Sequence, residues 1–327
     1  MPFSDKKKVF CTGLICCDVP LKPIPADMLE INNAAIETPV LIPGGDATNV
    51  AISISRLGMQ SCLTGLVGED FYGTFVLDYL KKEGVDIRAV QRHKVYGTSV
   101  SYILIDTAGE RHFLTYSPIN GELCIDHIRE DLLKECDLVY IGSSMSVKGL
   151  DHGGSAELFK KAHSMGKITA SDFDGDGVPG YWLKELDSML GETDILLPSL
   201  REATALTGKK ELNEIRDALS VYHPKILAVK LGRQGCYVTD FKNEWNIPSF
   251  DEFSPVDTTG AGDSFGAGFV RAYLSGWDTE ACGLFACAVA GFNVTKVGAT
   301  GGVPSFEIVY NFITERFGKE RFPIGAG

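Results

Sequence analysis

The stretch DTTGAGDSFGAGF, residues 257–269, joins a glycine-rich turn to the beginning of a helix. Phe265, Phe269 and Ala272 recur at helical spacing after the turn, so the pattern predicts a helix that begins near Gly260. The stretch lacks the spacing of the two common nucleotide fingerprints, GxxxxGK[ST] and GxGxxG. The stretch nevertheless combines a glycine turn, one carboxylate and the start of a helix within a few residues.

This turn is a candidate anion site. The first N–H groups of a helix have no partner inside it and lie at its positive end, so those of Gly260, Ala261, Gly262 and Asp263 can hold a phosphate or the charge on a transferred phosphoryl group. Asp263 would lie beside that site, where it can accept the proton of a substrate hydroxyl as the oxygen attacks phosphorus. A simpler interpretation also remains open, in which Asp263 is only a stabilising charge in the first helical turn.

A second motif, PGGDATNVAISISRLG, lies about 200 residues earlier and places two adjacent glycines before a predicted helix. Gly44 and Gly45 would let backbone amides approach a small ligand closely, and Asn49 offers a donor and an acceptor suited to sugar hydroxyls. The alternative is an ordinary Gly-Gly turn with Asp46 or Thr48 as the helix cap.

Apolar runs of strand length alternate with helical patterns, and several runs are apolar on both faces, as in a parallel sheet covered by helices. The runs are residues 9–17, 61–67, 138–141, 167–171, 195–197 and 226–230. Helices are expected at 47–57 and 71–83. The class is therefore α/β. Asp18 ends the first run, and the carboxyl ends of strands are where such sheets bind ligands.

Two segments, 19–41 and 96–116, break this alternation. The first is rich in proline, and the second alternates polar and apolar residues around a turn at 107–110. Together they could form a small antiparallel sheet outside the main body of a single domain that spans 1–327.

The composition narrows the functional classes. The net charge of -12 repels nucleic acid and anionic membrane surfaces, and no apolar run is long enough to cross a bilayer. The apolar stretch at 9–17 fits a buried strand better than a signal peptide. Nine cysteines without a CxxC spacing suggest free thiols in a reducing cytoplasm.

Taken together, the two motifs resemble the signatures of the ribokinase-like (PfkB) carbohydrate kinase family, and the similarity spans nearly the whole chain. The resemblance implies a three-layer α/β/α domain with a mostly parallel sheet, and a small β-sheet lid formed by 19–41 and 96–116. It implies ATP and Mg²⁺ as cofactors. By this resemblance Asp263 is the catalytic base, and the backbone of 260–263 is the anion hole. The residues that bind the sugar would be Asp18, Gly44, Gly45 and Asn49.

Other positions follow from the resemblance less directly. Glu202 matches a glutamate that orients the water shell of magnesium, although Ser199 stands where the family has asparagine. The segment KLGRQG matches a nucleotide-side motif, so nucleotide-binding residues would be Lys230, Gly232 and Gly235. A monovalent cation site, with potassium activation that varies across the family, is implied near Asp257 and Thr259, with carbonyls around Asn293 and Gly298.

Two acidic features bear on the substrate. Asp172 and Asp174, in the segment DFDGDG at 172–177, match another strand-end motif of the family, and the same segment has the beginning of a calcium loop without its final glutamate. Members of the family that act on sugar phosphates usually carry lysine where this chain has Asp46. An unphosphorylated sugar or sugar-like polyol is therefore expected as the small-molecule substrate.

Two other functions remain open. A nucleoside kinase would share both motifs, and Phe113 and Tyr116 are the nearest aromatic candidates for its base. A sugar- or nucleotide-binding regulator without turnover is the alternative from another class, and Ser199 is the feature in its favour. A dehydrogenase is disfavoured because the glycine triplet is missing after the first strand. The resemblance also implies a homodimer formed through the lid.

Overall fold

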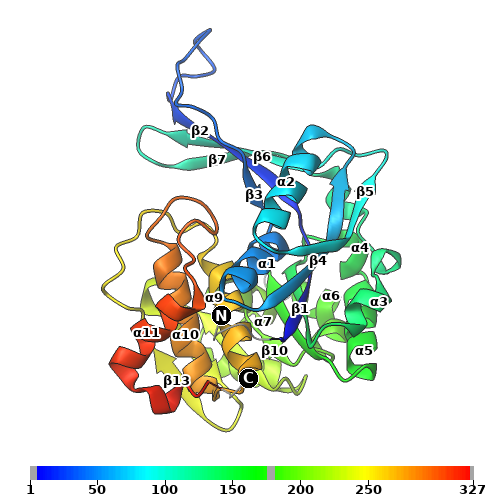
Figure 1. Cartoon of the computed structure of the whole chain (residues 1–327), viewed down its shortest axis with the longest axis vertical. Coiled ribbons are helices and arrows are strands. Elements are labelled where there is room, and N and C mark those ends of the chain that lie inside the picture. Colours follow the sequence, from blue (N-terminus) through cyan, green and yellow to red (C-terminus); the bar gives the residue numbers. More distant parts are fainter. Residues whose placement is uncertain (1–5, 175–180, 325–327) are drawn as a thin grey trace.

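The computed structural model describes residues 6–174 and 181–324. Within these ranges, the chain forms a nine-stranded sheet in the order β13-β12-β11-β10-β9-β8-β1-β4-β5 and a separate four-stranded sheet. Helices cover both faces of the larger sheet, and the smaller sheet stands at one end of it (Figure 1). The three-layer α/β/α fold with a β-sheet lid, predicted from the sequence, is confirmed.

The large sheet is parallel from β5 to β11, while β12 and β13 are added antiparallel at one edge. Its strands are β1 (Lys8–Thr12), β4 (Gln60–Gly68), β5 (Asp86–His93), β8 (Leu138–Ser144), β9 (Ile168–Phe173), β10 (Ile195–Leu196), β11 (Ile226–Lys230), β12 (Cys236–Thr239) and β13 (Glu244–Ile247).

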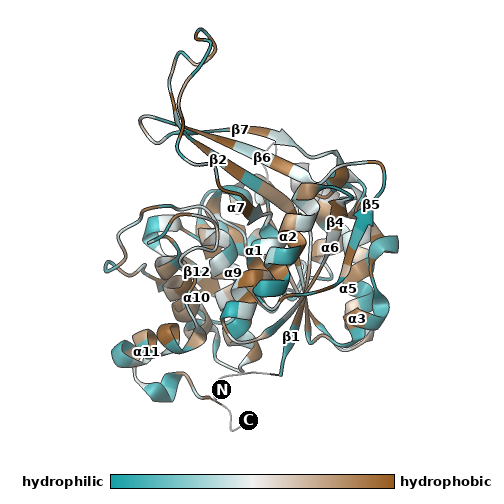
Figure 2. Cartoon of the chain, turned by 45° about the horizontal axis from the view of Figure 1, so that its top comes forward, coloured by the Kyte–Doolittle hydropathy of each residue, from teal (hydrophilic) through white to brown (hydrophobic). Residues whose placement is uncertain are grey.

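Both faces of this sheet are buried. On β1, Val9 and Cys11 belong to one hydrophobic core, and Phe10 between them belongs to the other. A strand with two buried faces has no polar alternation, which is why the strand runs are continuously apolar in the sequence. Figure 2 shows hydrophilic residues on the outward surfaces of helices such as α3 and α11.

Each core is closed by its own set of helices. The first is covered by α1 (Asp46–Arg56), α2 (Phe71–Lys82), α9 (Ala261–Leu274), α10 (Thr279–Asn293) and α11 (Phe306–Phe317). The second is covered by α3 (Glu130–Lys134), α5 (Gly154–Ser164), α6 (Tyr181–Leu190), α7 (Leu200–Thr207) and α8 (Leu212–Ser220), with the short α4 (Lys148–Asp151) before α5. The helices expected at 47–57, at 71–83 and from Gly260 are confirmed within one or two residues.

The first apolar run was predicted as one strand over 9–17, and this prediction is wrong. β1 ends at Thr12, and the next strand begins at Cys16 in the other sheet. Gly13 makes the break, because its φ of +147° suits glycine and an added Cβ would lie 2.7 Å from the carbonyl oxygen of Gly142. Asp18 therefore lies in the lid sheet and not at the end of β1.

The lid consists of β2 (Cys16–Ile24), β3 (Ile42–Gly44), β6 (Ser99–Asp106) and β7 (Arg111–Tyr116), in the order β3-β2-β6-β7. The hairpin of β6 and β7 turns at 107–110 as expected, and both outer pairings are antiparallel. The central pair, β2 with β6, is parallel. The small sheet expected from the sequence is thus antiparallel at both outer pairings and parallel at its centre.

Two helices converge where the lid meets the main sheet. Buried Arg271 of α9 donates through Nε to the carbonyl oxygen of Leu57, just after α1, at 3.0 Å. Because the two helices pack against each other, their N-terminal turns lie close together. Among the helices that the structure describes, none combines the length and hydrophobicity that a bilayer span requires.

Candidate active site

Asp263 lies in the first turn of α9 and receives a hydrogen bond from α1. Asn49 Nδ2 donates to Asp263 Oδ2 at 2.8 Å, across 214 residues of sequence. The two residues come from the two separate motifs, so the fold brings the motifs into one site. The hydrogen bond fixes one carboxylate oxygen and leaves the other available to a hydroxyl.

The surroundings of Asp263 suit a proton acceptor near neutral pH. Removal of water by the surrounding protein raises the pKa of Asp263 to about 7, and the nearby charge of Asp172 acts in the same direction. The hydrogen bond from Asn49 and the charge of Lys230 oppose this shift. A carboxylate with such a pKa is a stronger base than an exposed aspartate and is still ionised in half of the molecules at pH 7.

The glycine turn before α9 has the geometry of a helix N-terminus. Gly260 caps the helix with φ of +70°, and a Cβ at this position would collide with the carbonyl oxygen of Ala299. The amide of Ala261, predicted as part of the anion hole, donates instead to the carbonyl oxygen of Thr258 at 3.2 Å. The amides of Gly262 and Asp263 are therefore the better candidates to receive an anion.

Lys230 reaches this turn from the end of β11. A Cβ on Gly262 would lie 3.2 Å from Lys230 Nζ, so glycine leaves room for the ammonium group directly beside the turn. Lys230 is paired with Asp172, with Nζ 2.6 Å from each carboxylate oxygen. Burial alone would lower the pKa of Lys230, but Asp172 and Glu202 outweigh it and raise the pKa. Lys230 therefore stays charged, whether or not it also contacts a nucleotide.

The predicted substrate residues lie around the base of the lid. Asp18 on β2 packs against Gly44 on β3, where a Cβ would collide with the Asp18 carboxylate. Gly45 has φ of +94°, and a Cβ there would collide with the carbonyl oxygen of Leu14. Burial raises the pKa of Asp18 to about 6. Asn49 Oδ1 is buried and has no hydrogen-bond partner, so it is an acceptor that lacks a donor.

Carboxylates also line the wall opposite the lid. Asp46 accepts a hydrogen bond from Ser143 Oγ at 2.6 Å, and Asp174 accepts one from Ser146 Oγ at 2.9 Å. Burial and then the charge of Asp263 raise the pKa of Asp46 well above its usual range. Residues 175–177 of the calcium-like segment lie outside the described residues.

The sequence analysis missed two hydroxyls on the lid. Asp18, Ser101 and Thr115 are register partners across β2, β6 and β7, so their side chains lie on one face of the lid. Ser101 Oγ and Thr115 Oγ1 are 3.0 Å apart. Alternation along β6 and β7 could have suggested that they share a face, but only the parallel pairing of β2 with β6 aligns them with Asp18.

Comparison with known proteins identifies the family of the chain. The model of the pfkB family of carbohydrate kinases matches residues 6–305. The chain belongs to the PfkB family of carbohydrate kinases. It is 32% identical to an uncharacterised sugar kinase of Archaeoglobus fulgidus, over 77% of this chain and 98% of that protein. It is 31% identical to an ATP-dependent ribose-1-phosphate kinase of Halopiger xanaduensis, over 84% of this chain and 87% of that protein.

The fold agrees with solved structures. An Arabidopsis thaliana ribokinase complexed with ribose and ATP superposes with a TM-score of 0.80 at 23% identity, and the match covers 94% of this chain and 98% of that one. At this identity the likeness concerns the fold, and the roles of individual residues in this PfkB kinase follow from its own geometry.

Ser199, which stands where the family motif has asparagine, has a clear structural role in this PfkB kinase. Ser199 caps α7 by accepting a hydrogen bond from the Glu202 amide at 3.2 Å, while Glu202 Oε2 accepts one from the Ser199 amide at 2.7 Å. This reciprocal pair is a capping box. One oxygen of Glu202 is thus used in the cap, and the carboxylate still lies close enough to Lys230 and Asp172 for their charges to shift its pKa.

The glycines of the KLGRQG segment lie in the turn between β11 and β12. Gly235 has φ of +92°, and a Cβ there would collide with the carbonyl oxygen of Ile247. Gly232 is exposed, and a Cβ on it would have no neighbour within 4 Å. Gly235 is therefore explained by backbone packing, while Gly232 leaves an open surface at the turn between β11 and β12.

The four residues predicted to hold a monovalent cation do lie together, but protein donors bond to them. Asp257 accepts hydrogen bonds from the amides of Thr259 at 2.8 Å and Gly298 at 2.9 Å. Asn293 Nδ2 donates to the carbonyl oxygens of Ala299 at 2.9 Å and Thr259 at 3.4 Å. A further donor, Arg111 of the lid, also bonds to this group, and no pattern in the sequence predicted it.

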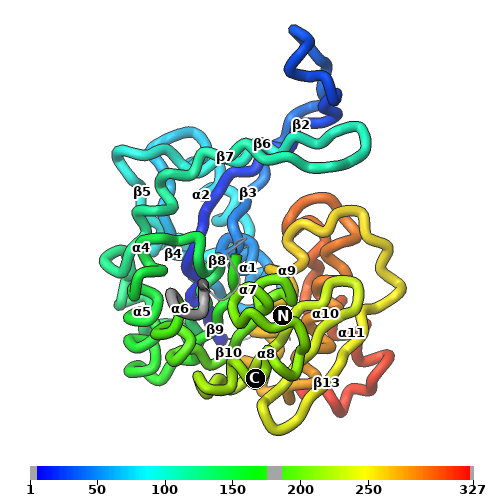
Figure 3. The backbone as a smooth tube through the Cα atoms, turned by 180° about the vertical axis from the view of Figure 1, so that it is seen from behind, coloured from blue at the N-terminus to red at the C-terminus, as the bar shows by residue number. Residues whose placement is uncertain are grey.

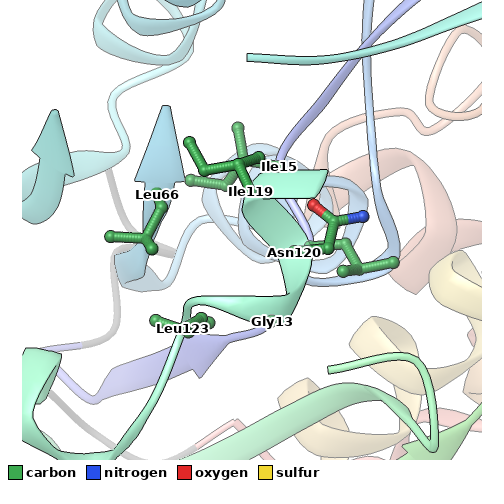
Figure 4. A pocket seen from close by; sticks show the side chains of 7 residues that line it. Gly13, Ile15, Leu66, Ile119, Asn120 and Leu123 are labelled. Atoms are coloured by element: carbon green, nitrogen blue, oxygen red, sulfur yellow. The ribbon is translucent and has the colours of Figure 1, made fainter. Parts of the chain in front are cut away.

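A small cavity lies beside the connection between β1 and β2, apart from this candidate site. Figure 4 shows it between Gly13, Ile15, Leu66, Ile119, Asn120 and Leu123. None of the residues that line it can titrate, so it offers no acid, base or charged ligand.

Proposed function

We propose that this PfkB kinase transfers the γ-phosphoryl group of ATP to a hydroxyl of an unphosphorylated sugar or sugar-like polyol. The hydrogen bond between Asn49 and Asp263 is the observation that carries the proposal, because it joins the sugar-side motif to a base at an anion-binding helix start. Family membership supports the same reaction class.

The mechanism uses groups that are already oriented. The substrate hydroxyl would donate to Asp263, and Asp18 and Asn49 Oδ1 would accept hydrogen bonds from neighbouring hydroxyls. As the O–H bond breaks, the proton passes to Asp263, the oxygen forms a bond to the γ-phosphorus, and the bond between that phosphorus and the ADP oxygen breaks. The amides of Gly262 and Asp263, with Lys230 beside them, would stabilise charge on the transferred group.

Magnesium fits the carboxylates on the nucleotide side. Glu202 is buried, keeps one oxygen outside its capping box and lies among other charged groups, so it would hold the water shell of Mg²⁺. When bound, the ion would neutralise charge on the phosphates.

Charge supports a neutral acceptor. Asp46 and Asp174 lie close enough to Asp263 to interact with it electrostatically, and the nearby lysine, Lys230, is already paired with Asp172. A phosphate already present on the substrate would meet these carboxylates without a cation to balance it. The ribose-1-phosphate kinase among the relatives makes this discrimination worth a direct test.

A nucleoside kinase is the second candidate, and one aromatic side chain favours it. Phe113 pairs with Ile103 in the register next to Ser101 and Thr115, so it shares the face of Asp18, and it is 59% exposed. A base could stack on it. Tyr116 pairs with Val100 and lies on the opposite face, so it would not serve this role.

The capping box of Ser199 argues against a regulator that binds its ligands without turnover. The replacement of asparagine by serine was the feature in favour of a regulator, and the capping box accounts for it without any loss of catalysis.

Dimerisation through the lid is part of the same proposal. β7 is an edge strand, and it exposes Leu114 and Tyr116 on the face opposite to Asp18. A second copy of the chain could pair with this edge, and light scattering after size exclusion would measure the mass of the assembly.

We also propose a cytoplasmic location. The nine cysteines are all free thiols, which is typical of proteins in a reducing compartment.

The test measures Mg·ATP-dependent ADP release with sugars, polyols, sugar acids, nucleosides and sugar phosphates. We expect turnover with a neutral sugar or polyol and a loss of about 10²- to 10⁴-fold in kcat for Asp263→Asn, which cannot accept the proton. Turnover with nucleosides alone would favour the second candidate. Binding of ATP and a sugar without ADP release by the unsubstituted protein would contradict the proposed function.

A further inference from the structure

Arg111 connects the lid to the loop that precedes α9. Its Nη2 lies 2.7 Å from Asp257 Oδ1, and its Nη1 donates to the hydroxyl of Thr259. The contact crosses 146 residues of sequence. Figures 1 and 3 agree that the hairpin of β6 and β7 extends over the loops before α9 and after α10. Arg111, at the start of β7, therefore ties the tip of the lid to the main body.

Asp257 is a buried, ionised partner for this arginine. It is 8% exposed, and burial alone would raise its pKa, but the amides of Gly298 and Thr259 and the Arg111 guanidinium together lower the pKa. The Arg111 side chain is 32% exposed, so the pair lies partly in the protein and is screened less than a surface ion pair. Arg111 thus supplies the positive charge that the buried carboxylate requires.

Protein donors occupy the oxygens that the resemblance assigned to a monovalent cation, and the carbonyl oxygens of Asn293 and Gly298 accept from the amides of Lys296 and Gly301. Both oxygens of Asp257 accept protein hydrogen bonds, the Thr259 hydroxyl accepts from Arg111, and Asn293 directs its amide nitrogen toward the carbonyl oxygens of Thr259 and Ala299. A bound K⁺ would have to compete with a guanidinium that is already at hydrogen-bond distance. The residues therefore do not fit the cation that the family resemblance implied.

We propose that Arg111 is a positioning residue that takes the place of a monovalent cation and couples closure of the lid to the shape of the anion-binding turn. Thr259 directly precedes Gly260, the cap of α9, so a contact at Thr259 acts next to the amides that would stabilise the phosphoryl group. The contact of Arg111 would then hold the lid and the glycine turn before α9 in position at the same time. The inference rests on the proposed kinase reaction, and it adds which side chain aligns the turn.

This coupling makes two distinct predictions for catalysis. The unsubstituted kinase should be insensitive to the monovalent cation, because its own side chain carries the charge. Removal of the charge should free the oxygens of Asp257 and Thr259, so that K⁺ can partly replace it. A small misplacement of the turn can cost about 100-fold in rate, so we expect Arg111→Gln to lower kcat by about 10- to 100-fold with a smaller effect on the sugar KM.

The experiment compares the unsubstituted kinase, Arg111→Gln, Arg111→Lys and Lys22→Gln in chloride salts of tetramethylammonium, sodium and potassium at constant ionic strength. Lys22 is the matched control, because it is a lid cation that pairs with Glu37 and not with Asp257. We expect less than a twofold cation effect for the unsubstituted kinase and the control. Arg111→Gln should be stimulated several-fold by K⁺, and Arg111→Lys should retain most of its kcat.

Amide hydrogen exchange gives a readout that does not depend on turnover. Residues 99–116 should exchange faster in Arg111→Gln than in the control, because the tip of the lid has lost its anchor. If no substrate is turned over, the proposed reaction fails while this measurement still tests the anchor. A K⁺ stimulation of tenfold or more in the unsubstituted kinase would overturn the proposal. Unchanged kcat and unchanged exchange in Arg111→Gln would overturn it equally.

Discussion

The floor of the site and the lid above it differ in how tightly they are held. On the floor, Asn49 is 4% exposed and hydrogen bonded to Asp263, and the glycine turns approach neighbouring backbone so closely that no Cβ fits. On the lid, Phe113 and Leu114 are more than half exposed, and β7 has no partner on its outer edge. In Figure 2 the lid strands mix hydrophobic and hydrophilic residues.

This difference separates two tasks. A proton acceptor and an anion-binding turn need fixed geometry, which a buried floor with helix N-termini provides. Choice of substrate depends on side chains that can change without loss of the fold, and an exposed sheet tolerates such changes. Substitutions on the floor should therefore affect kcat or abolish binding, while substitutions on the lid should change KM and selectivity.

The largest expected effect is the pH dependence of the floor. In the proposed mechanism the ionised form of Asp263 is the active one, and its pKa is raised to about 7, so kcat/KM should rise with pH and level off above about 7, and the titration of Asp263 alone should lower it roughly 100-fold at pH 5. Initial rates from pH 5 to 9 would show the profile. Asp18→Asn should bind sugar more weakly and keep the part of the pH dependence that has its midpoint near pH 7, while the part that Asp18 adds below its own pKa of about 6 should disappear. A profile that is flat below pH 7 would contradict the role proposed for Asp263.

A single methyl group at the junction of floor and lid should have the next largest effect. In Gly44→Ala the new Cβ would collide with the Asp18 carboxylate and displace it, and a hydrogen bond to a charged group is worth about 1.5–3 kcal/mol, so kcat/KM should fall by about 10- to 100-fold, mainly through KM. Gly121→Ala is the control, because a Cβ there meets no atom within 4 Å. Equal KM values for the two variants would show that Asp18 does not hold the substrate.

On the lid itself the effects should be smaller. Ser101→Ala with Thr115→Val removes two hydroxyls from the face of Asp18, and loss of a hydrogen bond is worth about 0.5–1.5 kcal/mol, so KM should rise about 2- to 13-fold with kcat preserved. Tyr116→Phe, on the opposite face, should leave both constants unchanged. A fall in kcat with constant KM would show that the lid takes part in the chemistry.

The smallest effect on activity is expected away from both regions. Ser199→Ala removes the cap of α7 and should cost about 1 kcal/mol of stability, seen as a Tm lower by roughly 2 °C, with kcat within about twofold. Ser199→Asn should keep the stability, because asparagine is also a good N-cap. A kcat loss larger than tenfold for Ser199→Ala would show that the side chain acts on the metal and not only on the helix.

The floor could be predicted from sequence far better than the lid. Its turns and helix starts are local features, so the start of α9 near Gly260 and that of α1 near residue 47 could be inferred from spacing. The continuous apolar run at 9–17 concealed the break at Gly13, because both halves are buried in different sheets. Local pattern does not indicate which sheet a strand joins.

Long-range pairing accounts for the remaining differences. The neighbours of Ser101 across the lid depend on β2 lying parallel to β6, and the partner of Arg111 is a residue 146 positions away. Neither relation leaves a periodic trace in the sequence. The four residues expected to bind a cation were correctly grouped, but their actual bonding depends on a lid side chain that the grouping did not include.

The parallel pairing of β2 with β6 also constrains how the chain folds. β2 ends at Ile24, and β6 begins at Ser99, with α1, β4, α2 and β5 between them. On a ribosome, β2 can pair with β3 early, but its other edge must wait until β6 has been synthesised, and closing this long loop carries an entropic cost that local hairpins avoid. We therefore expect the lid to assemble late, on a scaffold already formed by the first half of the main sheet.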